Sequence, residues 1–344
     1  MSRQRAPLRI GIAGFGRLSR DYYLPAFRTI EGARLVAVAD SLPASRAEAT
    51  RRLPSVDVYP DYPAMLERAS LDAILVATPP SSHLEIWNHA AARGVPVFME
   101  KPFVLCGQLD KIERGKATSN LMVDFNRRFW PTYRRVAELV RRGVPGRPVE
   151  GDFRLHVDLL GWSTVTRHRL SGEEGGILHD LGSHAVDLAA DLLGEEPEGV
   201  TAEMRSRRWP EDHLLITLAF ADGSIVRCDL AYADRTVERL SVRGPLGTLR
   251  LADPNMAIHY ERAGTTGPRL AARLVDAGVF GYRALRRARS MARFSIRSAL
   301  AVFVRALSDG ERFSPGFDDA VRNVRWLEAA ARSMVEQRPA RLPA

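Results

Sequence analysis

Residues 8–19 read Leu8-Arg9-Ile10-Gly11-Ile12-Ala13-Gly14-Phe15-Gly16-Arg17-Leu18-Ser19. The first six are largely apolar, which is typical of a strand buried in a parallel sheet. Two glycines follow, and residues at helical spacing continue to about residue 30, with Pro25 inside the stretch. Strand, glycine turn and helix in this order predict a fold that binds a dinucleotide by its pyrophosphate at the helix N-terminus.

The glycine turn supplies the expected pyrophosphate contacts. The first glycine permits a tight turn, and the second lets backbone N–H groups approach the phosphates. The third position of this fingerprint normally holds Gly or Ala for close helix packing, and here it is Ser19. Serine is small, so the departure is mild. The predicted cofactor-binding residues of the turn are Gly14, Phe15, Gly16, Arg17 and Leu18.

Further strands and helices alternate in the first third of the chain. Apolar runs at 34–39, 71–77 and 95–99 predict buried strands, and residues 82–93 have helical spacing. Strands separated by helices of this length indicate βαβ units and a parallel sheet. We therefore expect a dinucleotide-binding domain of the α/β class over residues 1–124.

The pattern changes in the rest of the chain. Strand candidates cluster with short turns over about residues 149–260, as in an antiparallel sheet, and one helix is expected at 181–193. A last helix is expected at 318–335. We predict that residues 125–344 form an α+β domain with a large, mostly antiparallel open sheet.

Composition is that of an ordinary globular protein, with 344 residues of which 45% are hydrophobic. The stretch before the first strand has no apolar run, so we expect no secretory leader, and no run in the sequence approaches the roughly 20 apolar residues of a membrane span. The two cysteines, Cys106 and Cys228, have no partners at metal-ligand spacing. We therefore expect a reduced cytoplasmic protein without a membrane partner.

Positive charge is the main bias, with a net charge of +9 and a pI near 10.0. The excess concentrates over residues 268–297, where arginines alternate with apolar residues at roughly helical spacing. This pattern predicts one or two amphipathic helices whose basic face is solvated, binds an anionic ligand or contacts another subunit. It lacks the aromatic interleaving or helix pair of a nucleic-acid reader, so we expect no nucleic-acid partner.

Asp40 ends the second predicted strand. A carboxylate at this place can accept both hydroxyls of the adenosine ribose and repels a 2′-phosphate, which favours NAD over NADP. Ser41 and Arg46 leave NADP open. An Asp that merely caps the strand end is the alternative.

The loop after the strand at 71–77 reads Thr78-Pro79-Pro80-Ser81-Ser82-His83. Open α/β sheets bind ligands at the carboxyl ends of their strands. We therefore predict that Thr78, Pro79 and His83 border the nicotinamide or its ribose. A simple helix cap by Ser81 or Ser82 is the alternative.

Lysine is scarce in this arginine-rich chain and occurs only at Lys101, Lys111 and Lys116. The first of these lies in Glu100-Lys101-Pro102, at the end of a predicted strand. Arginine stays protonated in proteins, whereas lysine can deliver or accept a proton. Lys101 is therefore a catalytic candidate, and its position by chance is the alternative.

A second polar group lies in Gly175-Gly176-Ile177-Leu178-His179-Asp180-Leu181-Gly182-Ser183-His184-Ala185-Val186-Asp187. Asp180 and His184 are four apart and would share one helix face. Histidine is a natural base for taking an alcohol proton during hydride transfer, and Asp187 could orient its ring. Helix capping and a metal pair with His179 are the alternatives. No third ligand stands at a recognised spacing, so we expect no metal.

Together, these residues resemble the glucose–fructose oxidoreductase/inositol dehydrogenase/MocA (Gfo/Idh/MocA) oxidoreductases. The resemblance spans nearly the whole chain and implies a Rossmann domain followed by an α/β domain whose open sheet forms a homodimer or homotetramer. It rests on the glycine turn, Leu24-Pro25-Ala26-Phe27, Thr78-Pro79 to His83, Glu100-Lys101-Pro102, Asn126-Arg127-Arg128-Phe129 and the 175–187 stretch.

The resemblance also implies roles for single residues. Lys101 would bridge the nicotinamide ribose and the reacting hydroxyl, with Glu100 in the cofactor site. Asp180 would bind substrate or tune the proton relay, and His184 would be the general base.

Two further residues, Arg128 and His179, would approach the substrate. The chain departs from the family pattern at Ser19, at Pro80, where Asn is frequent, and at His179, where an apolar residue is common. The basic segment 268–297 is a further departure. The last two departures leave the substrate and the assembly open.

The activity that the resemblance implies is NAD(P)-dependent hydride transfer between the nicotinamide and a secondary alcohol of a sugar, a cyclitol or a sugar derivative. The positive charge suggests a phosphorylated or nucleotide-linked sugar. The alternatives are a dihydrodiol-type or double-bond reductase of the same family and a non-catalytic dinucleotide-binding regulator.

Overall fold

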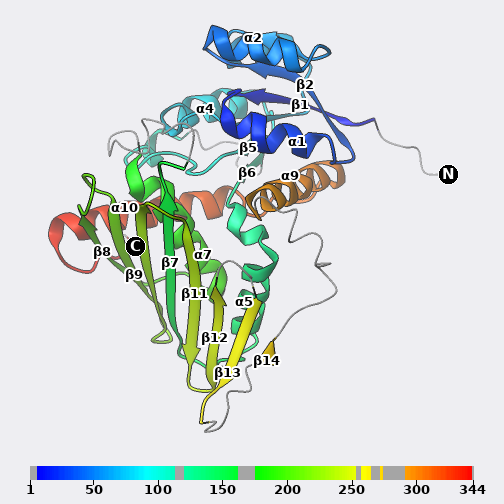
Figure 1. The fold of residues 1–344 in the computed structure, drawn as a ribbon. Helices are drawn as coiled ribbons and strands as arrows, with labels where there is room; N and C mark the ends of the chain where they lie inside the picture. The colour runs from blue at the N-terminus through cyan, green and yellow to red at the C-terminus, as the bar shows by residue number, and fades with distance from the viewer. Residues whose placement is uncertain are drawn as a thin grey trace. The chain divides into compact units, whose positions relative to one another are not determined.

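The computed structural model describes residues 6–112, 120–161, 175–252, 257–264, 272–273 and 291–342. The chain divides into two compact units (Figure 1). The first comprises Met1–Phe129 and Arg289–Arg322, and the second Trp130–Ala288 and Asn323–Ala344. The first unit thus takes in a C-terminal segment that lies outside the expected domain of residues 1–124.

The first unit contains a six-stranded sheet in the order β3-β2-β1-β4-β5-β6, in which every strand pair is parallel. The order reverses between β1 and β4, and such a switch point is where open α/β sheets bind ligands. The α/β prediction is therefore confirmed. The strands are β1 (Leu8–Ala13), β2 (Ala33–Ala39), β3 (Asp57–Tyr59), β4 (Ala73–Val76), β5 (Val97–Met99) and β6 (Leu121–Val123).

Helices and helical turns connect these strands. The expected helix to residue 30 is instead a π-helical turn followed by a short α-helix, which has Pro25 in its first turn, where the missing N–H of proline costs no helical hydrogen bond. In the described residues, the connecting elements are η1 (Ser19–Tyr23), α1 (Leu24–Phe27), α2 (Pro43–Arg52), α3 (Tyr62–Arg68), η2 (Pro80–Ser82), α4 (His83–Ala92) and η3 (Leu109–Lys111), and η5 (Asn126–Phe129) follows β6.

Helix α9 (Met291–Asp309) completes the core of the first unit (Figure 1). Its buried residues Ile296, Leu300 and Phe303 pack in one cluster with Ile10 of β1 and Phe98 of β5. The rings of Phe98 and Phe303 meet edge to face at 5.4 Å. Most of the predicted basic segment 268–297 lies outside the described residues, which cover only residues 272–273 and 291–297 of it.

The second unit contains an eight-stranded sheet in the order β14-β13-β12-β11-β7-β10-β9-β8. The central pair β7–β10 is parallel and all other pairs are antiparallel, which confirms the mostly antiparallel sheet. The strands are β7 (Glu150–Asp158), β8 (Gly199–Arg205), β9 (His213–Ala219), β10 (Ile225–Ala233), β11 (Val237–Gly244), β12 (Gly247–Ala252), β13 (Ala257–Arg262) and β14 (Ala272–Arg273).

One face of this sheet is covered and the other is polar. On β7, Gly151, Phe153 and Leu155 are buried, whereas the alternate residues Asp152 and Arg154 are exposed. Successive side chains of a strand point to opposite faces, so the pattern separates a core face from an open face. The helices of the unit are α5 (Pro131–Arg141), η7 (Leu178–Gly182), α7 (Ser183–Leu193) and the part of α10 (Phe317–Glu336) from residue 323 onward. In the described part of the chain, no helix has the length and apolar character to span a membrane.

Candidate active site

The glycine turn has the geometry that its sequence predicts. Gly14 has φ +89°, and a Cβ built on it would lie 2.7 Å from the carbonyl oxygen of Ala77, so only glycine fits. A Cβ on Gly16 would meet nothing within 4 Å, which leaves open space beside the start of the helical stretch. Ser19 is buried, and its hydroxyl donates to the Gly14 carbonyl at 2.5 Å, which closes the turn.

Asp40 ties the turn to the end of β2. Its Oδ2 accepts the N–H of Phe15 at 2.7 Å and its Oδ1 accepts the N–H of Leu42 at 2.8 Å. The carboxylate therefore does cap backbone groups, and each oxygen keeps acceptor capacity for a ribose hydroxyl. Arg46 donates to the carbonyl oxygens of Asp40 and Ser41 at 2.9 and 2.8 Å.

The two remaining residues of the predicted turn set lie just beyond it. Arg17 and Leu18 are partly buried, and Nε of Arg17 lies 3.2 Å from Oδ2 of Asp21, four residues further on. This pair holds part of the guanidinium along the helical stretch.

The loop after β4 is joined to the Lys101 segment by His83. The ring is fully buried, with Nδ1 2.8 Å from the Pro102 carbonyl and Nε2 3.0 Å from the Thr78 carbonyl. Burial lowers the pKa of His83 below its usual value. Both ring nitrogens thus lie at hydrogen-bond distance from backbone carbonyls, so His83 links the loop to the segment that bears Lys101. Of the three residues predicted to border the nicotinamide, Thr78, Pro79 and His83, only Pro79 is exposed.

Ser82 does not cap α4 through its side chain. Its hydroxyl instead hydrogen-bonds to Oγ1 of Thr78 and to the carbonyl of Pro79, both at 2.8 Å. The hydroxyl therefore braces the loop that was predicted to border the nicotinamide.

Lys101 follows β5 and is partly buried, between the buried residues Glu100 and Pro102. Glu100 accepts a hydrogen bond from the hydroxyl of Tyr23, which also bonds to Asp124. Sequence reasoning missed Tyr23 and Asp124. Asp124 carried a usable signal, since it is an acid directly after a strand of the parallel sheet, as Asp40 is.

Arg128, also in the first unit, is held in an ion pair. Its Nη1 and Nη2 atoms both lie 3.2 Å from Oδ1 of Asp319, and the guanidinium stacks over the ring of Phe125. Arg322 donates to the same Asp319 oxygen at 2.9 Å. The predicted approach of Arg128 to a substrate is not tested by these contacts and stays a prediction.

Asp180 and His184 belong to the second unit, where η7 runs directly into α7. Asp180 is partly buried, and His184 is 6% exposed. The hydroxyl of Tyr232 on β10 donates to Oδ2 of Asp180 at 3.2 Å. Tyr232 carried no sequence signal, because a lone tyrosine in an apolar strand is usual for a core residue.

His179 and Ser183 support the backbone of this segment. Nδ1 of His179 lies 2.6 Å from the Gly175 carbonyl, and the ring is largely buried. The Ser183 hydroxyl donates to the His179 carbonyl at 2.7 Å, and Asn323 donates to the Ser183 carbonyl at 2.9 Å. Helical turns of the π type recur at functional sites, which supports a functional role for η7 and the residues Asp180 and His184.

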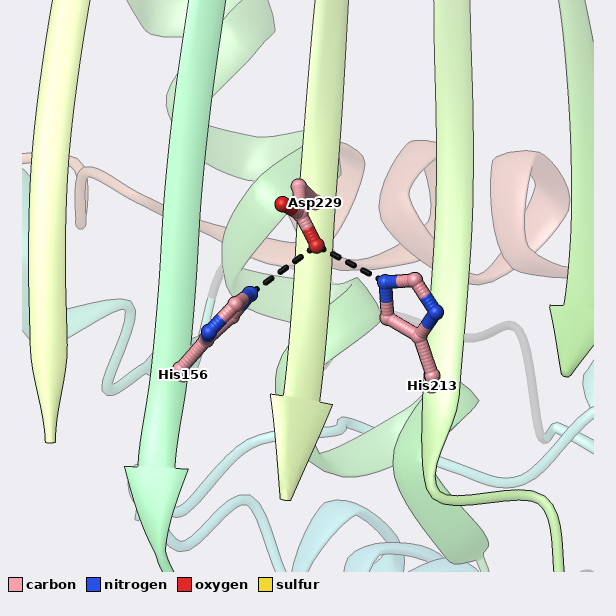
Figure 2. Close-up of side chains that lie close together, drawn as sticks. All are labelled: His156, His213 and Asp229. Atoms are coloured by element: carbon pink, nitrogen blue, oxygen red, sulfur yellow. Dashed lines mark hydrogen bonds and ion pairs between the residues drawn. The ribbon is translucent and has the colours of Figure 1, made fainter. Parts of the chain in front are cut away.

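A separate cluster on the sheet of the second unit joins three side chains of types that can ligate a metal, two histidines and one aspartate (Figure 2). Nε2 of His156 on β7 and Nε2 of His213 on β9 lie 2.9 and 2.8 Å from one oxygen, Oδ1 of Asp229 on β10. Arg154 donates to the other oxygen at 2.9 Å. The carboxylate is thus already satisfied by hydrogen bonds from these three side chains, and the expectation of no metal stays a prediction.

Comparison with known proteins identifies the family. A model described as an oxidoreductase family with an NAD-binding Rossmann fold matches residues 8–127, and the model of the GFO/IDH/MocA C-terminal domain matches residues 133–250. The chain belongs to the Gfo/Idh/MocA oxidoreductases. As a Gfo/Idh/MocA protein, it is an oxidoreductase with an NAD-binding Rossmann fold.

Curated relatives extend over most of the chain. D-apiose dehydrogenase of Paraburkholderia graminis is 33% identical over 271 residues, which are 74% of this chain and 70% of the relative. Inositol 2-dehydrogenase of Rhizobium meliloti is 28% identical over 355 residues, covering 96% of this chain and 98% of the relative. An oxidoreductase domain protein from Kribbella flavida has the same fold, with a TM-score of 0.82, 20% identity and coverage of 99% and 100%.

Proposed function

We propose that this Gfo/Idh/MocA protein is a dehydrogenase for a secondary alcohol of a sugar or cyclitol. The substrate carbon loses a hydride to the nicotinamide and its hydroxyl loses a proton, which yields a ketone, the reduced dinucleotide and H⁺. The names of the apiose and inositol dehydrogenases support this substrate class. The observation that carries the proposal is Lys101 at the carboxyl end of β5, in the same parallel sheet as β1 and its glycine turn, whose geometry admits only glycine at residue 14.

The proposed catalytic group is Lys101, Asp180 and His184. Lys101 acts at the nicotinamide ribose and the reacting hydroxyl, and His184 takes the hydroxyl proton as general base. Asp180, held by Tyr232, orients the substrate or the base. Arg128 and His179 contribute to the substrate site.

NAD is the proposed cofactor, in preference to NADP. The carboxylate of Asp40 lies at the end of β2 with acceptor capacity for the adenosine ribose, and it would repel a 2′-phosphate. Gly14, Phe15, Gly16, Arg17 and Leu18 are proposed at the pyrophosphate, and Thr78, Pro79 and Glu100 nearer the nicotinamide. For His83 we propose a positioning role through Thr78 and Pro102.

The assay pairs NAD or NADP with neutral sugars, inositols and nucleotide sugars. We expect reduction of NAD with a neutral polyol. Thermal shifts with nucleotide sugars but not with neutral sugars would favour the charged substrates instead. Turnover only with dihydrodiols or activated double bonds would move the protein to the alternative reductase class.

Variants test the catalytic group directly. Lys101→Ala should abolish turnover and leave dinucleotide binding measurable by fluorescence, whereas Lys111→Ala, an exposed lysine, should behave like the wild type. Unchanged turnover in Lys101→Ala overturns the assignment. If the wild type binds the dinucleotide but turns over no member of the substrate panel, the alternative of a non-catalytic dinucleotide-binding regulator would be supported.

For the assembly we propose a homodimer or homotetramer formed through the open face of the eight-stranded sheet. The support is the polar, uncovered face that β7 presents. Light scattering after size exclusion measures the mass, and a monomer at working concentration contradicts the proposal.

A further inference from the structure

Three polar side chains meet inside the first unit, although they are far apart in the sequence. Met99 of β5 pairs with Val123 of β6, so Glu100 and Asp124 leave adjacent parallel strands at the same edge of the sheet. Tyr23 ends η1, the turn after the glycines. The cluster Tyr23–Glu100–Asp124 thus lies at the ligand-binding edge of the fold, next to Lys101.

This cluster is shielded from water. Tyr23 and Asp124 are 0% exposed, and Glu100 is 7% exposed. The Tyr23 hydroxyl is hydrogen-bonded to Oε1 of Glu100, and it lies 2.8 Å from Oδ2 of Asp124. Its ring also packs edge to face on Phe98 of β5.

The Tyr23 hydroxyl contacts two carboxyl groups but cannot donate a hydrogen bond to both. A phenol has one proton, so Tyr23 can donate to only one of the two carboxyl groups. If both carboxyls were ionised, one carboxylate oxygen would face a phenol lone pair, and two negative charges would share one buried site. Both conditions are costly in a low-dielectric interior.

One additional proton resolves the conflict. With the proton on Asp124, Asp124 donates to Tyr23 and Tyr23 donates to Glu100, so every hydrogen bond has one donor and one acceptor. The pair then carries a single negative charge, on the residue that precedes Lys101. Two carboxyls in one buried site titrate as a coupled pair, so ionisation of one opposes ionisation of the other.

The surroundings place that proton on Asp124. Asp124 is the more deeply buried acid, and burial followed by the charge of Glu100 raises its pKa well above the usual 3.8. The hydrogen bond with Tyr23 and the charge of Lys101 act in the opposite direction and do not reverse the shift. Glu100, Tyr23 and Lys101 are the ionisable groups that act on Asp124 in the described part of the chain.

We propose that Tyr23, Glu100 and Asp124 form a buried chain that keeps one carboxyl proton on Asp124 at neutral pH and fixes the segment bearing Lys101. Tyr23 and Asp124 are positioning residues, since they act on Lys101 through Glu100. The positioning half rests on the proposed function of Lys101. The retained proton does not depend on it.

Infrared spectroscopy of the resting protein tests the proton without any turnover. The wild type should show the carbonyl stretch of a buried carboxylic acid at neutral pH, and Asp124→Asn should lose it. Asp57→Asn, which removes an exposed acid of the same unit, should keep it. A wild type without the band, or a band that survives in Asp124→Asn, overturns the proposal.

Kinetics test the positioning. Tyr23→Phe should lower kcat roughly tenfold to a hundredfold, since small displacements of reacting groups have effects of this order. Its dinucleotide Kd should stay within about threefold, which is under 1 kcal/mol. Asp124→Asn keeps an N–H donor for Tyr23 and should retain most of kcat, whereas Asp124→Leu should not.

The outcomes separate the two claims. Tyr23→Phe with full kcat, or Asp124→Leu equal to Asp124→Asn, overturns the positioning role. If Lys101→Ala keeps its turnover, the proposed function fails while the infrared result still reports on the proton. Should Tyr23→Phe not fold, the comparison of Asn with Leu at residue 124 decides alone.

Discussion

On β10, the hydroxyl of Tyr232 donates a hydrogen bond to Oδ2 of Asp180 at 3.2 Å. This contact joins the sheet of the second unit to the turn η7, which carries the proposed substrate-binding carboxylate. The orientation of that carboxylate thus depends on a strand residue 52 positions away in the sequence.

Tyr232→Phe should lower kcat/KM for the alcohol substrate roughly tenfold, because one hydrogen bond to a charged group contributes about 1.5 kcal/mol or more. Dinucleotide affinity should not change. Steady-state kinetics with both substrates varied measure the effect. Tyr260→Phe is the matched control, since it removes a hydroxyl that bonds to the Val144 and Leu246 carbonyls. Equal kinetics for the two variants would contradict the role of Tyr232.

Alanine at the two turn glycines should affect two different properties, stability at Gly14 and dinucleotide binding at Gly16. Gly14→Ala places a Cβ 2.7 Å from the Ala77 carbonyl at φ +89°, so it should lower the free energy of unfolding by more than about 1 kcal/mol. Gly16→Ala meets no atom within 4 Å and should leave stability nearly unchanged while weakening dinucleotide binding. Urea unfolding and fluorescence titration separate the two. A Gly16→Ala protein that binds NAD normally would remove Gly16 from the pyrophosphate site.

Asp40→Ala should shift the cofactor preference toward NADP, because the charge that repels a 2′-phosphate is lost. We expect the ratio of kcat/KM for NAD over NADP to fall by roughly tenfold or more, which is about 1.4 kcal/mol. Asp61→Ala is the control, because it also removes an acceptor of a backbone N–H, at the start of α3, and it should cost only stability. An unchanged ratio in Asp40→Ala would refute the NAD assignment.

Asp124 should make stability fall as pH rises. Its pKa is raised in the folded protein, so the folded state keeps a proton that the unfolded chain releases above the usual value of 3.8. The free energy of unfolding of the wild type, measured against Asp124→Asn, should therefore decline from about pH 4 upward. Urea titrations at a series of pH values give this difference. A difference that stays flat across the range argues against a retained proton.

Asp229 should show the opposite sign. The hydrogen bond from His156, with those from His213 and Arg154, holds the pKa of this carboxyl below its usual 3.8. The stability that it contributes is present above that value and is lost as pH falls below about 4. The wild type should therefore lose its advantage over Asp229→Asn in acid. An advantage that persists to low pH would show that the hydrogen bonds in Figure 2 do not depend on the charge of Asp229.

Strand periodicity predicted most of the first sheet. The apolar runs at 34–39 and 71–77 correspond to β2 and β4, and the glycine turn stands where expected. The three-residue strands β3 and β6 were not predicted, because such short strands show no period, whereas the equally short β5 lies within the longer apolar run 95–99. The parallel pairing of β7 with β10 also escaped, because spacing along the chain indicates only which neighbouring strands form hairpins.

The candidate site was predictable only in part. Lys101, Asp180 and His184 stood out because their chemistry and local motifs are visible in one segment each. Tyr232 and Tyr23 did not, because a tyrosine in or beside an apolar stretch has the signature of an ordinary core residue. His83 carried a functional signal, and the structure shows both of its nitrogens on backbone carbonyls.

By itself, the sequence determined the dinucleotide turn, the parallel first sheet and the identity of the candidate acids and bases. These depend on local backbone preference and on the period of apolar residues, which a short segment carries on its own. Only the tertiary structure decided that α9 completes the core of the first unit and that Tyr23 joins Glu100 to Asp124. The physical reason is that burial and proton sharing depend on which distant side chains meet, and strand order sets those contacts.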